Sequence, residues 1–131
     1  MILLDTHALV WMVSDSSRLS RTAARELRKA ERSGELAIAS ISLWELALLY
    51  HHGRLRTSGS IEAAIRMILE KSRVQVIEVT PEIAALTTTF PETYPKDPAD
   101  RLIGATARAF GLTLVTQDER ILSSPLIRSI W

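Results

Sequence analysis

The sequence contains no cysteine and few aromatic residues, and both absences narrow the possible functions. Without cysteine, the chain has no disulfide framework, no thiolate metal site and no cysteine nucleophile. Aromatic residues make up only 5% of the chain, which argues against a base-stacking platform such as that of an RRM. The three histidines follow no metal-ligand pattern, so a metal site would have to rest on other side chains.

A large net charge and a long apolar run are also lacking. The 16 basic and 15 acidic residues leave a charge of +1, so any preference for nucleic acid must come from where the charges lie. The run Leu36–Trp44 ends at Glu45 and is far shorter than the ~20 residues of a membrane span. Asp5 closes the apolar start Met1–Leu4, which has no basic leader. We therefore expect no signal peptide, a fold that begins at residue 1, and a cytoplasmic protein.

What is present is a chain of 131 residues, 47% of them hydrophobic, which suffices for one domain over residues 1–131 with its own core. Short apolar runs alternate with segments of helical periodicity. The expected strands are Ile2–Leu4, Leu36–Ser40, Val74–Val79, Leu112–Thr116 and Leu126–Ile130. The expected helices are His7–Val13, Arg21–Ser33, Ser42–His52, Ile61–Lys71, Pro81–Thr88, Pro98–Phe110 and Asp118–Ser123, with Ser20 and Ser60 as N-caps and a loop over Phe90–Lys96. This alternation predicts an α/β fold, a three-layer α/β/α sandwich with a central twisted parallel sheet of about five strands.

Four acidic residues lie at corresponding places beside the expected strands. Asp5 directly follows the first strand, Asp118 follows the fourth, and Glu45 and Asp100 lie in the first turns of two helices. Because parallel strands end at one edge of the sheet, these side chains should converge there, Asp100 with the help of the loop before its helix. Gathered carboxylates repel one another, and a hard cation such as Mg²⁺ or Mn²⁺ relieves that repulsion and can activate water.

Helix capping offers an alternative explanation for each acid taken alone. Ser42 and Glu45 have the spacing of a capping box, and Asp5 and Asp118 are each placed to cap a following helix. Asp97-Pro98-Ala99-Asp100 is an equally good helix start, with Asp97 the most cap-like residue of the set. Capping would accept Ser, Thr or Asn equally well, so the agreement of charge and position in four places favours a site.

The acids belong to four short segments with a characteristic order. The segments are Leu3-Leu4-Asp5-Thr6-His7, Ser42-Leu43-Trp44-Glu45, Asp97-Pro98-Ala99-Asp100-Arg101-Leu102-Ile103 and Leu114-Val115-Thr116-Gln117-Asp118. Each segment is a weak signal alone, but the ordered set spans almost the whole chain. Through these four segments the chain resembles the PIN-domain nucleases, and among them the VapC-type ribonuclease toxins of VapBC toxin–antitoxin pairs.

The resemblance implies an endoribonuclease that depends on Mg²⁺ or Mn²⁺. By position, the acidic metal-binding and catalytic residues would be Asp5, Glu45, Asp100 and Asp118, and Thr116, Thr6, Asp97 and Arg101 would support them. Arg101 could either balance the acidic site or hold its helix in place. The resemblance further implies an RNA substrate, a homodimer and inhibition by a VapB-like antitoxin. Water rather than the 2′-hydroxyl would attack the phosphorus, so the products should carry a 5′-phosphate and a 3′-hydroxyl.

A basic stripe marks the second expected helix. Its members recur at alternating spacings of three and four residues and are Arg18, Arg21, Arg25, Arg28 and Arg32. Such a stripe could contact RNA phosphates, but it is also what an ordinary solvated helix face looks like.

Two rival functions use the same fold. A non-catalytic RNA-binding or protein-interaction module would not need clustered carboxylates. A phosphatase or receiver domain that forms an aspartyl-phosphate would need further acidic partners, whereas Asp5-Thr6-His7 has no second aspartate and no clear catalytic lysine follows the fourth strand. Metal titration and RNA cleavage assays would separate these functions.

Overall fold

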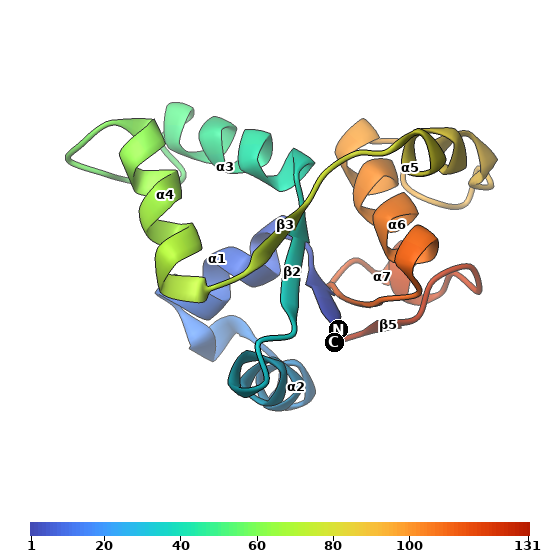
Figure 1. The fold of residues 1–131 in the computed structure, drawn as a ribbon, viewed down its shortest axis with the longest axis horizontal. Coiled ribbons are helices and arrows are strands. Elements are labelled where there is room, and N and C mark those ends of the chain that lie inside the picture. Colours follow the sequence, from blue (N-terminus) through green and yellow to red (C-terminus); the bar gives the residue numbers. More distant parts are fainter.

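A five-stranded parallel sheet forms the centre of the protein in the computed structural model, which describes residues 1–131. The strands are β1 (Ile2–Leu4), β2 (Leu36–Ala39), β3 (Gln75–Ile77), β4 (Thr113–Val115) and β5 (Ser129–Ile130). Their order across the sheet is β3-β2-β1-β4-β5, with every neighbouring pair parallel (Figure 1). The central strand is β1, where Leu3 lies between Ala37 and Leu114. The predicted α/β class and parallel sheet are confirmed.

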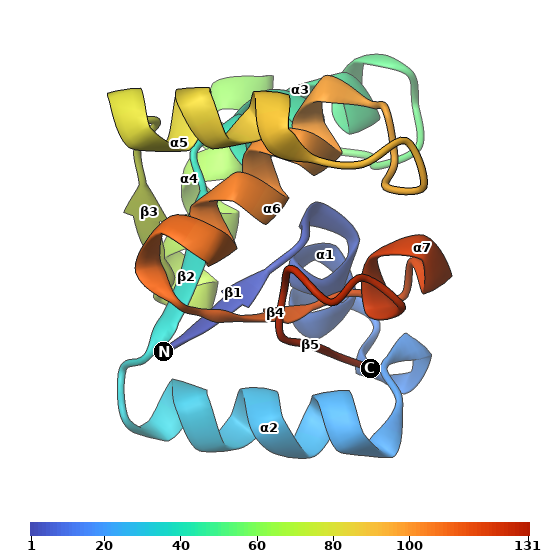
Figure 2. The ribbon, with the colours of Figure 1, turned by 90° about the vertical axis from the view of Figure 1, so that its right-hand side faces the viewer.

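Helices cover both faces of this sheet and complete the three layers. On one side lie α1 (Thr6–Ser14), α2 (Arg21–Arg32), α3 (Ile41–His51) and α4 (Ile61–Ser72), and on the other α5 (Pro81–Leu86), α6 (Pro98–Phe110) and α7 (Glu119–Leu122) (Figures 1 and 2). Two short 3₁₀ helices, η1 (Ser16–Arg18) and η2 (Thr87–Thr89), link these elements. None of the helices is long and apolar enough to cross a membrane.

Alternate residues of the strands build two separate cores. Leu3 and Leu114 point into the core under α5, α6 and α7, together with Ile83 and Ile103. The next residue of each strand points the opposite way, so Leu4 and Val115 lie in the core under α1 to α4. Because both faces of β1, β2 and β4 are covered, every residue of these strands except Thr113 is apolar.

The polar residues at the helix starts mostly act as predicted. Ser20, Ser60 and Thr80 accept hydrogen bonds from the backbone N–H groups of Ala23, Ala63 and Ile83 at the starts of α2, α4 and α5. The start of α3 differs from the prediction, because it begins at Ile41 and buries Ser42 inside its first turn. The capping box expected between Ser42 and Glu45 does not form.

The two edge strands are shorter than the sequence suggested. β3 covers only Gln75–Ile77 of the expected Val74–Val79, and its side chains Gln75 and Val76 are exposed. β5 contains only Ser129 and Ile130 of the expected Leu126–Ile130, and Ile127 is buried in the same core as Phe90. An edge strand has a single hydrogen-bonding neighbour, which limits how far pairing extends.

The loop from Phe90 to Lys96 is held tightly and sets the start of α6. Tyr94 stacks on Phe90 with ring centroids 4.1 Å apart, and its hydroxyl donates a hydrogen bond of 3.0 Å to the backbone carbonyl of Asp100. Gly104 leaves the space for this packing, since a Cβ there would overlap the Tyr94 hydroxyl. The loop thus returns the chain to the edge of the sheet where β1 and β4 end.

Candidate active site

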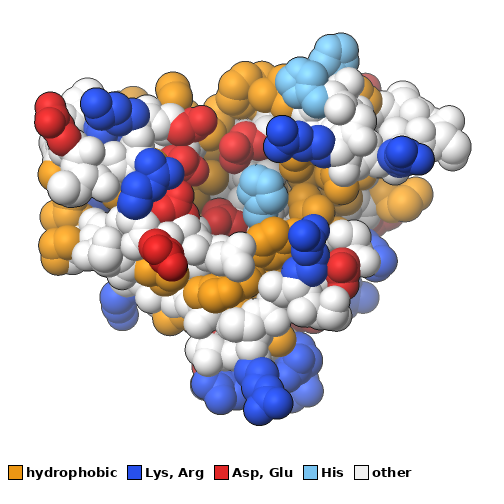
Figure 3. Space-filling view, turned by 180° about the vertical axis from the view of Figure 1, so that it is seen from behind, with side chains coloured by type: hydrophobic (Ala, Val, Ile, Leu, Met, Phe, Trp, Pro, Cys, Tyr) orange, Lys and Arg blue, Asp and Glu red, His pale blue; other side chains and the backbone are white.

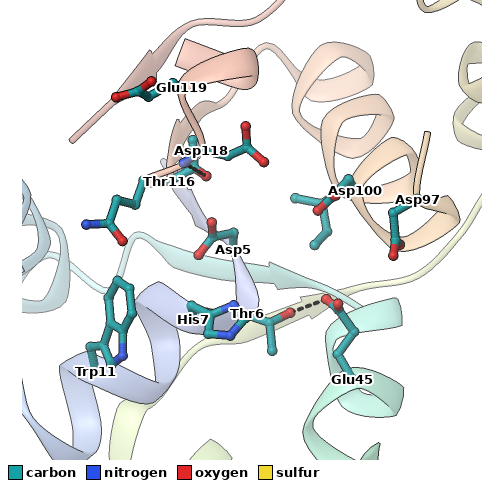
Figure 4. A pocket seen from close by; sticks show the side chains of 12 residues that line it. Asp5, Thr6, His7, Trp11, Glu45, Asp97, Asp100, Thr116, Asp118 and Glu119 are labelled. Atoms are coloured by element: carbon teal, nitrogen blue, oxygen red, sulfur yellow. Dashed lines mark hydrogen bonds between the residues drawn. The ribbon is translucent and has the colours of Figure 1, made fainter. Parts of the chain in front are cut away.

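A cleft of about 730 Å³ opens at the carboxyl ends of the central strands. Six acidic residues line it, from β1, α3, the α6 start and the segment after β4: Asp5, Glu45, Asp97, Asp100, Asp118 and Glu119. Figure 3 shows acidic side chains around a hollow in the middle of one face. Figure 4 shows Asp5, Glu45, Asp97, Asp100 and Asp118 around the cleft, with Glu119 at its margin and directed away from them. The structure therefore brings together all four acids that the sequence singled out.

Asp5 lies at the base of the cleft and serves as a cap at the same time. Its backbone N–H donates to the Val115 carbonyl at 3.1 Å, and its Oδ1 accepts from the Ala8 N–H at 2.8 Å, which begins α1. Burial raises the pKa of the Asp5 carboxyl, although hydrogen bonding to Thr116 and Ala8 partly offsets this. The capping and site explanations are thus compatible, because the capping bond uses only Oδ1 and the same carboxyl lines the cleft.

Glu45 is held across the cleft from Asp5 by a chain of hydroxyls. The Thr6 Oγ1 lies 2.9 Å from the Ser42 Oγ and 2.5 Å from the Glu45 Oε1, and Thr6 is only 2% exposed. A hydroxyl has one proton and a carboxylate only accepts, so Thr6 donates to Glu45 and accepts from Ser42. Burial raises the pKa of Glu45 despite this hydrogen bond. Ser42 therefore supports Thr6 instead of capping α3.

Asp100 lies among four other acidic residues of the cleft, and its carboxyl is repelled by all of them. Burial, followed by repulsion from Asp97, Glu45, Asp118 and Asp5, raises the pKa of its carboxyl to about 6. No hydrogen bond within the chain satisfies its side-chain oxygens, unlike those of Asp5 and Asp118. A half-buried carboxylate without partners costs folding free energy at neutral pH and is free to bind a ligand.

Asp118 is bound by an arginine that the sequence analysis did not single out. Its Oδ1 caps α7 by accepting from the Arg120 N–H at 2.9 Å, and its Oδ2 lies 3.2 Å from the Arg120 Nη2. Partial burial opposes ionisation, but the hydrogen bonds and charge of Arg120 outweigh it and hold the pKa of Asp118 below its usual value. Thr116, fully buried at the end of β4, accepts from the Asp118 N–H at 3.2 Å and fixes the turn between them.

The two remaining predicted supporting residues have different surroundings. Asp97 caps α6 by accepting from the Ala99 N–H at 2.8 Å and also lines the cleft, where its charge raises the pKa of Asp100. Arg101 does not line the cleft. It donates to the carbonyls of Pro95 at 3.0 Å and Thr87 at 3.3 Å, so it holds the loop before α6. The structure thereby decides between the two roles left open for Arg101.

Three further lining residues complete one side of the cleft. His7 and Trp11 lie on the side of Asp5 (Figure 4), and Gln117 also lines the cleft. The ring of Trp11 lies 5.8 Å from that of His7 and 5.6 Å from that of Trp131. His7 and Gln117 belong to two of the four segments quoted from the sequence, beside Asp5 and Asp118, whereas Trp11 lies outside all four. Trp11 reaches the cleft because α1 places it one turn after His7, which only the docking of the helix reveals.

The oxygen-rich donor set of the cleft fits a hard divalent cation. Asp5, Glu45 and Asp100 all have a raised pKa, and an ion between them would remove the repulsion that contributes to it. No three acidic or histidine side chains are close enough in this structure to form a ready coordination sphere. The acidic residues therefore share the cleft without forming one coordination sphere in this structure.

Comparison with known proteins agrees with this geometry. The PIN domain family profile matches residues 2–124, which is nearly the whole chain. The chain belongs to the PIN-domain family. It is also 38% identical over 122 residues to Ribonuclease VapC22 of Mycobacterium tuberculosis, covering 93% of this chain and 90% of that relative, which places this PIN domain in the VapC group.

Solved structures show the same PIN fold at lower sequence identity. VapBC2 from Rickettsia felis, bound to a DNA fragment from its promoter, superposes with a TM-score of 0.74 at 19% identity, covering 100% of this chain and 99% of that one. FitAcB from Neisseria gonorrhoeae gives a TM-score of 0.70 at 20% identity, over 100% and 97% of the two chains. These likenesses confirm the fold that the sequence predicted.

Proposed function

We propose that this PIN domain, residues 1–131, is a metal-dependent endoribonuclease that acts as the toxin of a type II toxin–antitoxin pair in the cytoplasm. The observation that supports this most directly is the convergence of Asp5, Glu45, Asp100 and Asp118 on one open cleft. The similarity to a protein named Ribonuclease VapC22 supplies the substrate class. A non-catalytic binding module would gain nothing from three carboxylates whose pKa values burial raises.

In this proposal Asp5, Glu45, Asp100 and Asp118 hold Mg²⁺ or Mn²⁺. When bound, the ion would lower the pKa of water and stabilise negative charge on the phosphoryl group. Asp5 and Asp100 are the most direct ligands, because burial deprives Asp5 of water and Asp100 has no competing partner. Thr6 positions Glu45, and Thr116 supports both Asp5 and the Asp118 turn. Attack by water leaves a 5′-phosphate and a 3′-hydroxyl.

Cleavage of labelled single-stranded RNA with Mg²⁺, with EDTA and with the Asp5→Asn variant tests the proposal. We expect cleavage with Mg²⁺ and none with EDTA. The cleavage rate of Asp5→Asn should fall by at least about 100-fold, because the variant lacks a carboxylate that would hold the ion, and the ion would stabilise the transition state by several kcal/mol. Glu78→Gln, which removes an exposed carboxylate outside the cleft, is the matched control and should cleave normally. Cleavage that persists in EDTA would reject the metal mechanism, and binding without cleavage in wild type would favour the non-catalytic module.

We further propose that a VapB-like antitoxin inhibits the nuclease and that the toxin forms a homodimer. Support comes from the VapBC and FitAcB complexes that share the fold, and from apolar surface on this chain. A second cleft of about 370 Å³ lies between α1, α4 and the loop after α3, with Val10, Leu55 and Met67 in its lining. We assign this apolar cleft to the antitoxin, because it is distinct from the acidic one and Met67 is 67% exposed there.

A further inference from the structure

The outer face of α2 presents a row of exposed arginines. The arginines Arg21, Arg25, Arg28 and Arg32 are all exposed, whereas Ala23, Leu27 and Ala30 on the opposite face are buried in the core. Figure 3 shows the resulting group of basic side chains at the lower end of the molecule. The helical rise of ~1.5 Å per residue spreads the four arginines over roughly 16 Å along the axis.

Most of these guanidinium groups have no acidic partner in the chain. Arg25 lies 3.6 Å from Glu26, and no salt bridge joins Arg18, Arg21, Arg28 or Arg32 to a carboxylate. On α4, by contrast, Arg66 pairs with Glu62 at 3.0 Å in the usual surface arrangement. The α2 face therefore retains positive charge that an ordinary solvated helix face would partly neutralise.

Arg18 connects this face to the acidic cleft. Its guanidinium carbon lies 5.4 Å from the centre of the Trp11 ring, in the geometry of a cation–π contact, and Trp11 itself lines the cleft. From Arg18 the chain runs directly into α2 at Arg21. In Figure 3 hydrophobic side chains lie directly below the acidic hollow, and white atoms of other side chains and backbone lie between them and the basic group. Trp11 and Arg18 thus link the cleft to the start of the row of arginines on α2.

We propose that a single strand of the RNA substrate leaves the cleft beside Trp11 and lies along α2, with its phosphates on Arg18, Arg21, Arg25, Arg28 and Arg32. This inference rests on the proposed nuclease function and extends its substrate site. A cleft lined by six acidic residues repels a polyanion, so affinity for RNA has to come from a neighbouring basic surface. The row of arginines provides this affinity through phosphate contacts, which do not depend on the RNA sequence. Cleavage takes place in the acidic cleft.

The test measures the affinity of an unstructured RNA oligonucleotide at several salt concentrations, in an Asp100→Asn background that does not cleave. Arg21→Gln/Arg28→Gln is compared with Arg66→Gln/Arg73→Gln, which removes the same charge from exposed positions in and after α4. Each phosphate contact contributes ~0.7 to the slope of log K against log salt for single strands. We expect the α2 variant to bind more weakly and its slope to fall by about 1.4, with little change in the control.

The outcomes separate this inference from the proposed function. If wild-type protein cleaves RNA and the α2 variant keeps the wild-type slope, the α2 surface is rejected and the nuclease stands. If both double variants weaken binding equally, only net charge matters and the inference is again rejected. If the α2 variant binds RNA normally but loses affinity for its antitoxin, α2 is a protein interface. If wild type neither binds nor cleaves RNA, both proposals fail.

Gln is a good helix former, so the substitutions should keep α2 and α4 helical, and circular dichroism checks that the variants fold.

Discussion

At the scale of single residues, the cleft places carboxylates where they cost folding free energy. The pKa of Asp100 is raised to about 6, whereas the unfolded chain gives it an ordinary value near 3.8. At neutral pH the folded state must therefore hold a charge that burial and its acidic neighbours disfavour. Sites that sacrifice stability in this way are typical of catalytic centres, because the same free oxygens can bind a cation.

Replacing Asp100 with Asn should raise stability and remove activity together. In EDTA at pH 7 we expect a gain of about 1–2 kcal/mol, allowing for partial exposure of the side chain, which corresponds to roughly 3–6 °C in Tm. Calorimetry measures the gain, and RNA cleavage in Mg²⁺ should fall by at least about 100-fold. Glu78→Gln should change neither quantity. A variant that is less stable than wild type would mean that Asp100 makes a favourable interaction in the fold.

The same raised pKa predicts how the stability difference depends on pH. Between about pH 4 and pH 6 the folded state binds a proton at Asp100 that the unfolded state does not. Lowering the pH through this window therefore stabilises wild type and leaves the Asn variant unaffected at that position. In EDTA the gap in Tm between the two proteins should shrink from pH 7 towards pH 4. A constant gap over this range would contradict the assignment of the raised pKa to Asp100.

Thr6 should act on catalysis through Glu45. Its hydroxyl donates to the Glu45 carboxylate from a fully packed position, so Thr6→Ala removes the group that orients Glu45. Residues that orient ligands typically change affinity or activity by ~10–100-fold, and we expect a loss near the lower end in cleavage. Thr6→Ser keeps the hydroxyl and should restore most of the activity. If Ser is no better than Ala, the methyl group of Thr6 and its packing matter more than the hydrogen bond.

At the scale of elements, α6 depends on a glycine in its interior. Gly104 lies where a Cβ would overlap the Tyr94 hydroxyl, whose hydrogen bond to the Asp100 carbonyl fixes the start of the helix. Helix propensity favours Ala over Gly by ~1 kcal/mol, but overpacking costs ~1–3 kcal/mol. We expect Gly104→Ala to lower the free energy of unfolding in urea by about 1–2 kcal/mol, and cleavage to fall as Asp100 shifts.

A double-mutant cycle tests the cause of that loss. Tyr94→Phe alone removes one hydrogen bond and should cost about 1 kcal/mol. Because it also removes the atom that the new Cβ would meet first, the double variant should be more stable than the sum of the single losses by ~1 kcal/mol. Strict additivity would show that the clash with Ile127 or Phe90 dominates instead.

The elements also show what the sequence could and could not predict. Apolar runs separated by capped helices predicted the parallel sheet, and that topology alone gathered Asp5, Glu45, Asp100 and Asp118 at one edge. The capping box that the sequence offered as an alternative for Ser42 and Glu45 does not form, because both side chains bond Thr6, which lies 36 positions before Ser42. The entry of Trp11 into the cleft depends likewise on how α1 docks. Short-range patterns contain no information on such contacts. The contact of Arg120 with Asp118 is local, between residues two positions apart, and the sequence analysis missed it.

At the scale of the whole molecule, catalysis and inhibition should depend on separate surfaces. The acidic cleft opens at the strand ends, whereas the apolar cleft with Met67 lies between α1 and α4. A partner that buries an exposed methionine gains ~1.5–3 kcal/mol from that side chain, and an aspartate in its place would be left buried and unpaired.

Met67→Asp should therefore weaken antitoxin binding by at least about tenfold and leave RNA cleavage by the free toxin unchanged. Titration of toxin with antitoxin, followed by cleavage, measures both effects. Phe110→Asp is the matched control, since Phe110 is 54% exposed at the end of α6, outside this apolar cleft. If Phe110→Asp weakens the complex and Met67→Asp does not, the antitoxin lies on the α6 side. If both variants bind the antitoxin normally but change the mass of the free toxin in solution, the exposed apolar residues serve the homodimer instead.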